Sequence, residues 1–121
     1  MTVARNPLLA LHDIRDAIRR IEHYTEGMSS KQFDKNELVR DAVERRVEII
    51  SEASRRIPAD LKAQHREIPW PKIAGVGNVL RHDYDEIYSP LIWEIVEDHL
   101  PALKRAVAAM IREAKKPTSK K

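Results

Sequence analysis

Apolar residues recur every three or four positions near the start of the chain. Between residues 6 and 26 they form one stripe, made by Leu11, Ile14, Ile18 and Ile21. This spacing places them on one side of a helix, and the other side is polar. Pro7 is typical of a first helical turn, and Gly27 is typical of the position just past a helix end. The pattern predicts a first helix over residues 6–26.

A second apolar stripe begins just after a helix-capping signal. Ser29 and Gln32 have the spacing of a capping box, in which each side chain bonds the backbone of the other residue. The stripe continues to residue 57 through Val39, Val43, Val47, Ile50 and Ile57. Pro58 ends it, because a proline cannot continue the helical hydrogen-bond ladder. One continuous helix, the longest in the chain, is therefore expected from Ser29 or Ser30 to residue 57.

The next segments predict a loop followed by a short helix. Residues 58–69 are polar and contain two prolines, which indicates a loop with at most one helical turn. A helix is expected over residues 70–81, where one side carries Trp70, Ile73, Val76 and Leu80. Asn78 and His82, four residues apart, share a different side of this helix.

A fourth helix is predicted over residues 89–115. Ser89 is expected to cap it, with Pro90 in the first helical position. Pro101 lies inside the segment, which predicts a kink or break between residues 97 and 101. No segment alternates apolar and polar residues over the length of a strand. The predicted fold class is therefore all-α, a four-helix bundle with short connections.

Composition narrows the class of protein further. The 121 residues suit one domain, expected over residues 1–115, and 3 glycines with 5% aromatic residues argue against a β-sandwich. The absence of cysteine excludes a disulfide scaffold and fits a reducing cytoplasm. No apolar run is long enough to span a membrane, and the N-terminus is too charged for a signal peptide. Residues 116–121 are expected to form a flexible basic tail, solvated or in contact with nucleic acid.

Histidines and glycines are the first candidates for chemistry. Among the five histidines, His12 and His23 lie three helical turns apart, and no metal-binding spacing such as His-Glu-x-x-His occurs. We therefore expect neither a metal nor another cofactor. Gly75 and Gly77 lack the third glycine and the preceding strand of a phosphate-binding loop. They are expected to allow close packing of a short helix against a neighbour.

The densest polar cluster is the run GNVLRHDYDEIY at residues 77–88. Its imidazole, His82, can transfer protons near neutral pH. Its guanidinium, Arg81, can hold a phosphate group through two parallel hydrogen bonds. Together these groups suffice for RNA cleavage without a metal, because a base can activate a ribose 2′-hydroxyl against the adjacent phosphate. The alternative is a polar helix end without catalytic chemistry.

This cluster, with its surroundings, resembles the HEPN superfamily and within it the HepT-like ribonuclease toxins. The resemblance covers nearly the whole chain, with anchors at residues 38–58, 67–78, 81–84 and 91–104. It implies a four-helix HEPN bundle and a homodimer with an active cleft at the interface. It also implies a cognate antitoxin of the minimal nucleotidyltransferase type, which adenylylates a tyrosine of the motif.

The family pattern, Arg-Asn-x₃-His-x-Tyr, matches this chain at Asn78, His82 and Tyr84, but Gly77 stands where the arginine is expected. Arg81 lies four residues after Gly77, on the same side of the helix. Helical side chains tilt toward the N-terminus, so the Arg81 guanidinium can lie near the place of the missing one.

The long second helix offers other guanidinium groups, in Arg40, Arg45 and Arg46. Ion pairs with Glu44 or Glu48 are the simpler explanation for these arginines.

The sequence predicts a cytoplasmic toxin of the HepT-like kind, a metal-independent endoribonuclease acting on RNA such as tRNA. His82 is expected to be the general base or acid, Arg81 to clamp the phosphate, and Asn78 to orient it. Tyr84 is the expected site of adenylylation. The alternative is a catalytically impaired dimer that binds RNA or a protein.

Overall fold

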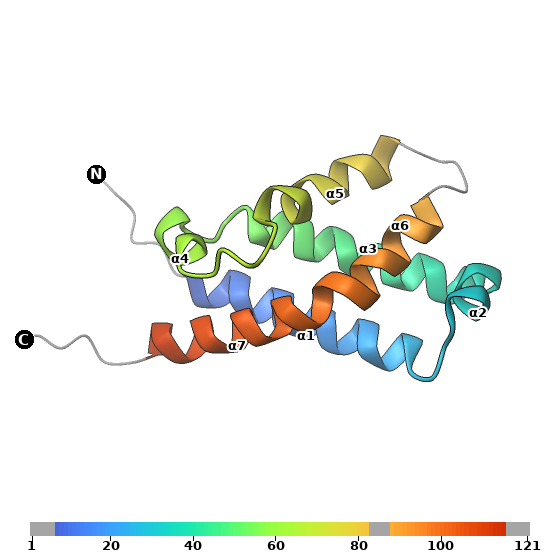
Figure 1. Cartoon of the computed structure of the whole chain (residues 1–121), viewed down its shortest axis with the longest axis horizontal. Helices are drawn as coiled ribbons and strands as arrows, with labels where there is room; N and C mark the ends of the chain where they lie inside the picture. Colours follow the sequence, from blue (N-terminus) through green and yellow to red (C-terminus); the bar gives the residue numbers. More distant parts are fainter. Residues whose placement is uncertain (1–6, 83–87, 116–121) are drawn as a thin grey trace, which may run out of the picture.

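The computed structural model describes residues 7–82 and 88–115, and nearly all of them lie in helices (Figure 1). Within these two ranges there is no strand. The predicted all-α fold is therefore confirmed. None of the helices in this part of the chain is long and apolar enough to cross a lipid bilayer.

Four helices form the body of the bundle: α1 (Pro7–Thr25), α3 (Glu37–Ser54), α5 (Trp70–His82) and α7 (Leu100–Lys115). The first of them, α1, packs on α3 along one side and on α7 along the other, and α5 packs on the outer side of α3. The stripe predicted for the first helix is fully buried and fills the space between these elements: Leu11, Ile14, Ile18 and Ile21.

The long second helix is broken, which corrects the prediction of one continuous helix. A short helix α2 (Ser30–Lys35) ends at Asn36, and α3 then starts at Glu37 in a new direction. Asn36 has extended backbone angles, and its side chain accepts a hydrogen bond from the Val39 N–H at 3.1 Å. An asparagine that caps the following helix in this way competes with continuation of the preceding one.

Packing explains why α2 separates from α3. The predicted capping box at Ser29 and Gln32 is confirmed, with both hydrogen bonds present. It fixes the start of α2 so that Phe33 enters the core, where it is completely buried. The Phe33 ring lies 5.0 Å from the ring of Trp93, between centroids. Consequently α3, with 18 residues, is shorter than α1, with 19.

The segment between α3 and α5 is the predicted loop with one short helix, α4 (Ala59–Ala63). Ile68 and Trp70 are buried at its end. The indole N–H of Trp70 donates a hydrogen bond to the His65 carbonyl at 3.1 Å. These contacts fix the point at which α5 begins.

The fourth predicted helix consists of α6 (Tyr88–Glu94), a π-helical turn η1 (Ile95–His99) and α7. The predicted kink is confirmed here: the Leu100 N–H bonds the Ile95 carbonyl five residues back, and Pro101 has no N–H to donate. Helix α6 begins at Tyr88, so Ser89 lies in its first turn, and the helix starts two residues before Pro90, the predicted first helical position.

Candidate functional site

Helix α5 carries the polar motif of Asn78, Arg81 and His82. The opposite side of α5 packs in the core. Ile73, Val76 and Leu80 are buried, whereas Asn78 is exposed. Arg81 and His82 form the last residues of the helix, and the structure does not describe their side chains. Tyr84 lies outside the described residues. The structure thus places Asn78, Arg81 and His82 within the last turns of one helix.

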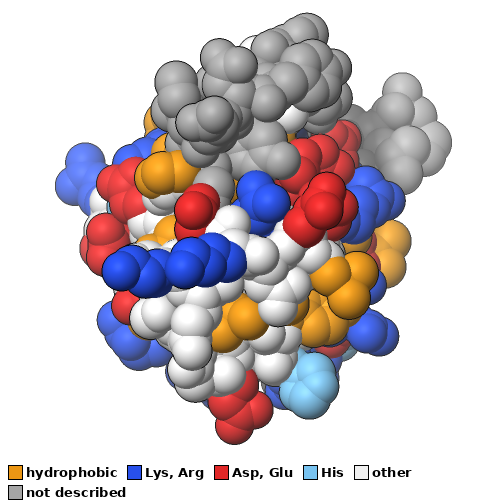
Figure 2. Space-filling model, turned by 90° about the vertical axis from the view of Figure 1, so that its right-hand side faces the viewer, with side chains coloured by type: hydrophobic (Ala, Val, Ile, Leu, Met, Phe, Trp, Pro, Cys, Tyr) orange, Lys and Arg blue, Asp and Glu red, His pale blue; other side chains and the backbone are white. Residues whose placement is uncertain are grey.

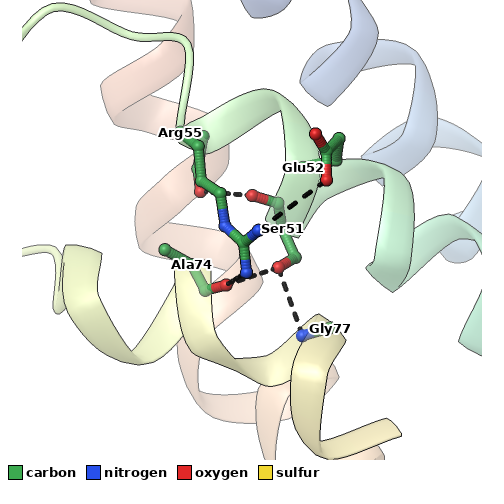
Figure 3. A network of polar contacts seen from close by, with 6 residues as sticks. Ser51, Glu52, Arg55, Ala74 and Gly77 are labelled. Atoms are coloured by element: carbon green, nitrogen blue, oxygen red, sulfur yellow. Dashed lines mark hydrogen bonds and ion pairs between the residues drawn. The ribbon is translucent and has the colours of Figure 1, made fainter. Parts of the chain in front are cut away.

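A network of polar contacts joins α5 to α3 just before the motif (Figure 3). The buried Ser51 hydroxyl donates to the Ala74 carbonyl at 2.8 Å and accepts the Gly77 N–H at 3.2 Å. Arg55 reaches across from α3 and donates through Nη2 to the same Ala74 carbonyl at 2.8 Å. These bonds fix the register of α5 against α3, and hence the height of the motif along the bundle.

The two glycines of α5 have different surroundings. Gly77, at the position of the family arginine, is buried where α5 meets α3. The expectation of close packing is correct there. A Cβ atom added at Gly75 would meet no heavy atom within 4 Å, so close packing does not explain that glycine. The expectation for Gly75 was wrong.

Sequence reasoning missed Arg55. Its side chain is 43% exposed, and its Nη1 lies 3.9 Å from a carboxylate oxygen of Glu52, so it combines contact with α5 and access to solvent. The adjacent Arg56 faces α1 instead and pairs with Asp13 at 3.3 Å. The available signal was spacing: Arg55 follows Ser51 by four residues and therefore shares its side of α3.

The three arginines proposed from the second helix lie in different surroundings. Arg45 is exposed and pairs with Glu48 at 3.5 Å, which is the simpler explanation anticipated for it. Arg40 is half-buried. Arg46 lies between α3 and α1, where it lines a hollow of about 690 Å³.

This hollow also contains Tyr24, Arg20 and Arg19 of α1. Hydrogen bonding from Arg20 is the largest influence on the Tyr24 phenol and lowers its pKa from the ordinary value; burial opposes this, and Arg46 adds to the lowering. One arginine from each helix, Arg20 from α1 and Arg46 from α3, therefore shares this hollow with the Tyr24 phenol and lowers its pKa.

An apolar surface lies beside Asn78 on α5. Val79 is 40% exposed, and a small hollow of about 260 Å³ is lined by Gly75, Val76, Val79 and Leu91, with Lys72 at its edge. Gly75 leaves this surface open. The surface joins α5 to α6 and is free of neighbours among the described residues at Gly75.

Charge at the end of the molecule where α2 and the start of α6 lie is mixed. Figure 2 shows acidic and basic side chains interspersed over this face. Attraction of an anion to this end therefore depends on individual guanidinium groups rather than on one broad positive field. No group of three or more histidine, aspartate or glutamate side chains suited to a metal ion occurs in residues 7–82 and 88–115.

The fold and the motif together define a class of protein: an all-α bundle with Asn-x₂-Arg-His at the end of a short helix. Comparison with known proteins identifies the family. The model of the family described as ribonuclease HepT-like matches residues 14–110. The chain belongs to this family, which is part of the HEPN superfamily. The resemblance inferred from the motif is confirmed.

Two curated relatives match over most of their length. A protein of Methanocaldococcus jannaschii, named as a candidate RNase, is 35% identical over 97 residues, 80% of this chain and 89% of its own. The "Probable ribonuclease HepT" of Thermococcus cleftensis is 38% identical over 94 residues, 78% of this chain and 86% of its own.

A third relative, from M. jannaschii, carries a name that joins a gamma-glutamylcyclotransferase to a candidate RNase. It is 32% identical over 111 residues, which are 92% of this chain and 50% of that protein. No solved structure matches the chain.

Proposed function

We propose that the chain is a metal-independent endoribonuclease of the HepT-like kind. The observation that carries this proposal is the last part of α5, where Arg81 and His82 follow the exposed Asn78 within a chain of this family. The names of its relatives support an RNA substrate. We further propose that the protein acts in the cytoplasm, on RNA such as tRNA.

The chemistry requires a base, an acid and a cation. His82 accepts the proton of a ribose 2′-hydroxyl, whose oxygen then attacks the adjacent phosphorus atom. The bond from phosphorus to the 5′-oxygen breaks, and a protonated imidazole donates a proton to that oxygen. The products are a 2′,3′-cyclic phosphate and a free 5′-hydroxyl. The 2′-hydroxyl supplies the nucleophile, so this route needs no metal-bound water.

The negative charge that develops on the phosphate requires a guanidinium. We assign this role to Arg81, because Gly77 provides none and Arg81 lies one turn later on the same side of α5. The Asn78 amide orients the phosphate from the preceding turn. Arg55, at the end of α3, is a second guanidinium in contact with α5, held at the Ala74 carbonyl.

We also propose that two copies of the chain complete one cleft. Each chain offers a single His82, whereas the reaction uses a base and an acid on opposite sides of the phosphorus. The apolar surface of Val79, Leu91 and the open Gly75 adjoins the motif and fits a second copy of α5. A cognate nucleotidyltransferase would silence the cleft by adenylylating Tyr84, because the added phosphate repels RNA.

A second function, binding of RNA or protein without cleavage, is favoured by one observation. Gly77 occupies the arginine position and its N–H is bonded to Ser51, so the family's own phosphate clamp is absent. If neither Arg81 nor Arg55 replaces it, the chain retains a binding surface without rate enhancement.

Cleavage of total tRNA in the presence of EDTA tests the proposal. The parent chain should produce fragments with 2′,3′-cyclic phosphate ends, and His82→Ala should abolish them. His65→Ala, a histidine outside α5, is the matched control and should cleave normally. Arg81→Lys should lose about a hundredfold to a thousandfold in rate, because lysine cannot form the planar bidentate contact. Binding of tRNA without any cleavage by the parent would favour the second function.

A further inference from the structure

The hollow between α1 and α3 lies on the opposite side of α3 from α5. Its walls are the polar side of α1 and the Arg46 side of α3. Neither the motif nor the apolar surface described above includes it. At about 690 Å³ it is the size of a nucleotide-scale ligand, and it is open to solvent.

Positive charge in this hollow is only partly balanced. Asp13 of the lining is paired with Arg56, which follows the end of α3. Arg20 and Arg46 both line the hollow together with Tyr24, and both lower the pKa of its phenol. Like charges that line one hollow repel each other, and an anion bound between them would relieve that repulsion.

Two carboxylates line the hollow, and they differ in whether an arginine outside the lining already pairs with them. Asp13 is engaged by Arg56 at 3.3 Å. Asp16 is the other acidic side chain of the lining, which also contains Arg19, Arg20 and Arg46. The hollow therefore contains three guanidinium groups and two carboxylates, and one of these carboxylates, Asp13, already pairs with Arg56.

We propose that the hollow formed by Arg20, Tyr24 and Arg46 binds a phosphate group of the RNA backbone. The identity of the ligand as RNA rests on the proposed function. Guanidinium groups hold phosphate oxygens through paired hydrogen bonds, and the Tyr24 hydroxyl can donate a third. An RNA strand that crosses α3 contacts the α5 motif on one side and this hollow on the other.

Salt dependence of RNA binding tests the proposal. We would measure the Kd of a labelled single-stranded RNA by fluorescence anisotropy, with EDTA and in a His82→Ala background that prevents cleavage. Arg20→Gln and Arg46→Gln should each weaken binding about two- to fivefold, as the loss of one exposed ion pair does. Each should also reduce the slope of log K against log salt by about 0.7. Tyr24→Phe should weaken binding without changing the slope, because no charge is lost.

The matched control is Arg112→Gln on α7, which removes an equal charge from an exposed helix away from the hollow. It should leave the slope unchanged. If Arg46→Gln prevents folding, the exposed Arg20→Gln alone decides. A slope for Arg20→Gln equal to that of Arg112→Gln would overturn the proposal. A second result would also overturn it. If Arg20→Gln weakens the binding of inorganic phosphate or AMP but leaves RNA binding unchanged, the hollow binds free phosphate rather than RNA.

The test is separate from that of the proposed nuclease. If the parent does not cleave RNA but Arg20→Gln lowers the slope, the hollow binds RNA and only the catalytic assignment fails. If the parent cleaves and the slope does not change, only the hollow assignment fails.

Discussion

The Ser51 hydroxyl offers a sharp test of how α5 is held. Replacing Ser51 with alanine removes one donor to the Ala74 carbonyl, at 2.8 Å, and one acceptor of the Gly77 N–H, at 3.2 Å. Ser51 is 2% exposed, so water does not readily replace the lost partner. The Ala74 carbonyl keeps its bond from Arg55. The Gly77 N–H lies beyond the first turn of α5 and keeps its acceptor within that helix. The cost is therefore the loss of the two hydrogen bonds that join Ser51 to α5.

The magnitude follows from general values for such losses. Each hydrogen bond contributes about 0.5–1.5 kcal/mol, so the loss of both costs about 1–3 kcal/mol, and alanine recovers about 0.5 kcal/mol through its higher helix propensity. The free energy of unfolding should fall by about 1–2 kcal/mol. For a chain of 121 residues, this lowers the Tm by about 4–8 °C.

Thermal unfolding followed by circular dichroism, at one fixed protein concentration, measures the effect. Ser54→Ala is the matched control, because Ser54 is also buried on α3 but donates only to the Ser51 carbonyl, at 2.7 Å within its own helix. Its loss removes one hydrogen bond within α3 and none to α5, so its Tm should change by about 2 °C or less. Equal Tm values for the two variants would refute the claim that Ser51 anchors α5.

Three further predictions concern single positions. Asn36→Ala removes the acceptor of the Val39 N–H and should lower the free energy of unfolding by about 1 kcal/mol in urea denaturation, with Asn36→Ser restoring most of it. Gly75→Ala should raise that free energy by about 0.5–1 kcal/mol, because its Cβ has open space; a loss would contradict this geometry. Tyr24 should ionise at a lower pH than an ordinary tyrosine in a spectrophotometric titration, and Arg20→Gln should raise its pKa. Because its folded-state pKa is lowered, its contribution to stability is present above the unfolded pKa and is lost as pH falls through the folded one, a dependence that Tyr24→Phe should remove.

The features that sequence predicted well depend on contiguous residues. The stripe of α1, the capping box at Ser29 and the kink near Pro101 each follow from the chemistry of a few neighbours. The placement of Asn78, Arg81 and His82 on one helix has the same origin. These properties need no knowledge of what packs against the segment.

The break at Asn36 was missed although its local signal was present. Asn36 and Val39 have the same spacing as Ser29 and Gln32, a side-chain acceptor three residues before a helical N–H. The apolar stripe starting at Val39 masked this second cap. What decides between one helix and two is the burial of Phe33 against Trp93, a contact between residues 60 positions apart that spacing along the chain does not reveal.

The directions of the arginine side chains in and just after α3 could not be predicted from the sequence. Four arginines of this region have the same side chain but different neighbours. Arg55 contacts α5, Arg46 and Arg56 lie toward α1, and Arg45 is exposed. Their rotation around α3 is set by which apolar stripe that helix buries, and therefore by the whole bundle. Which of these arginines lies beside the motif therefore follows from the fold and cannot be predicted from spacing along the chain. In this chain Arg55 lies against the helix of the motif, and Arg46 lines the separate hollow between α3 and α1.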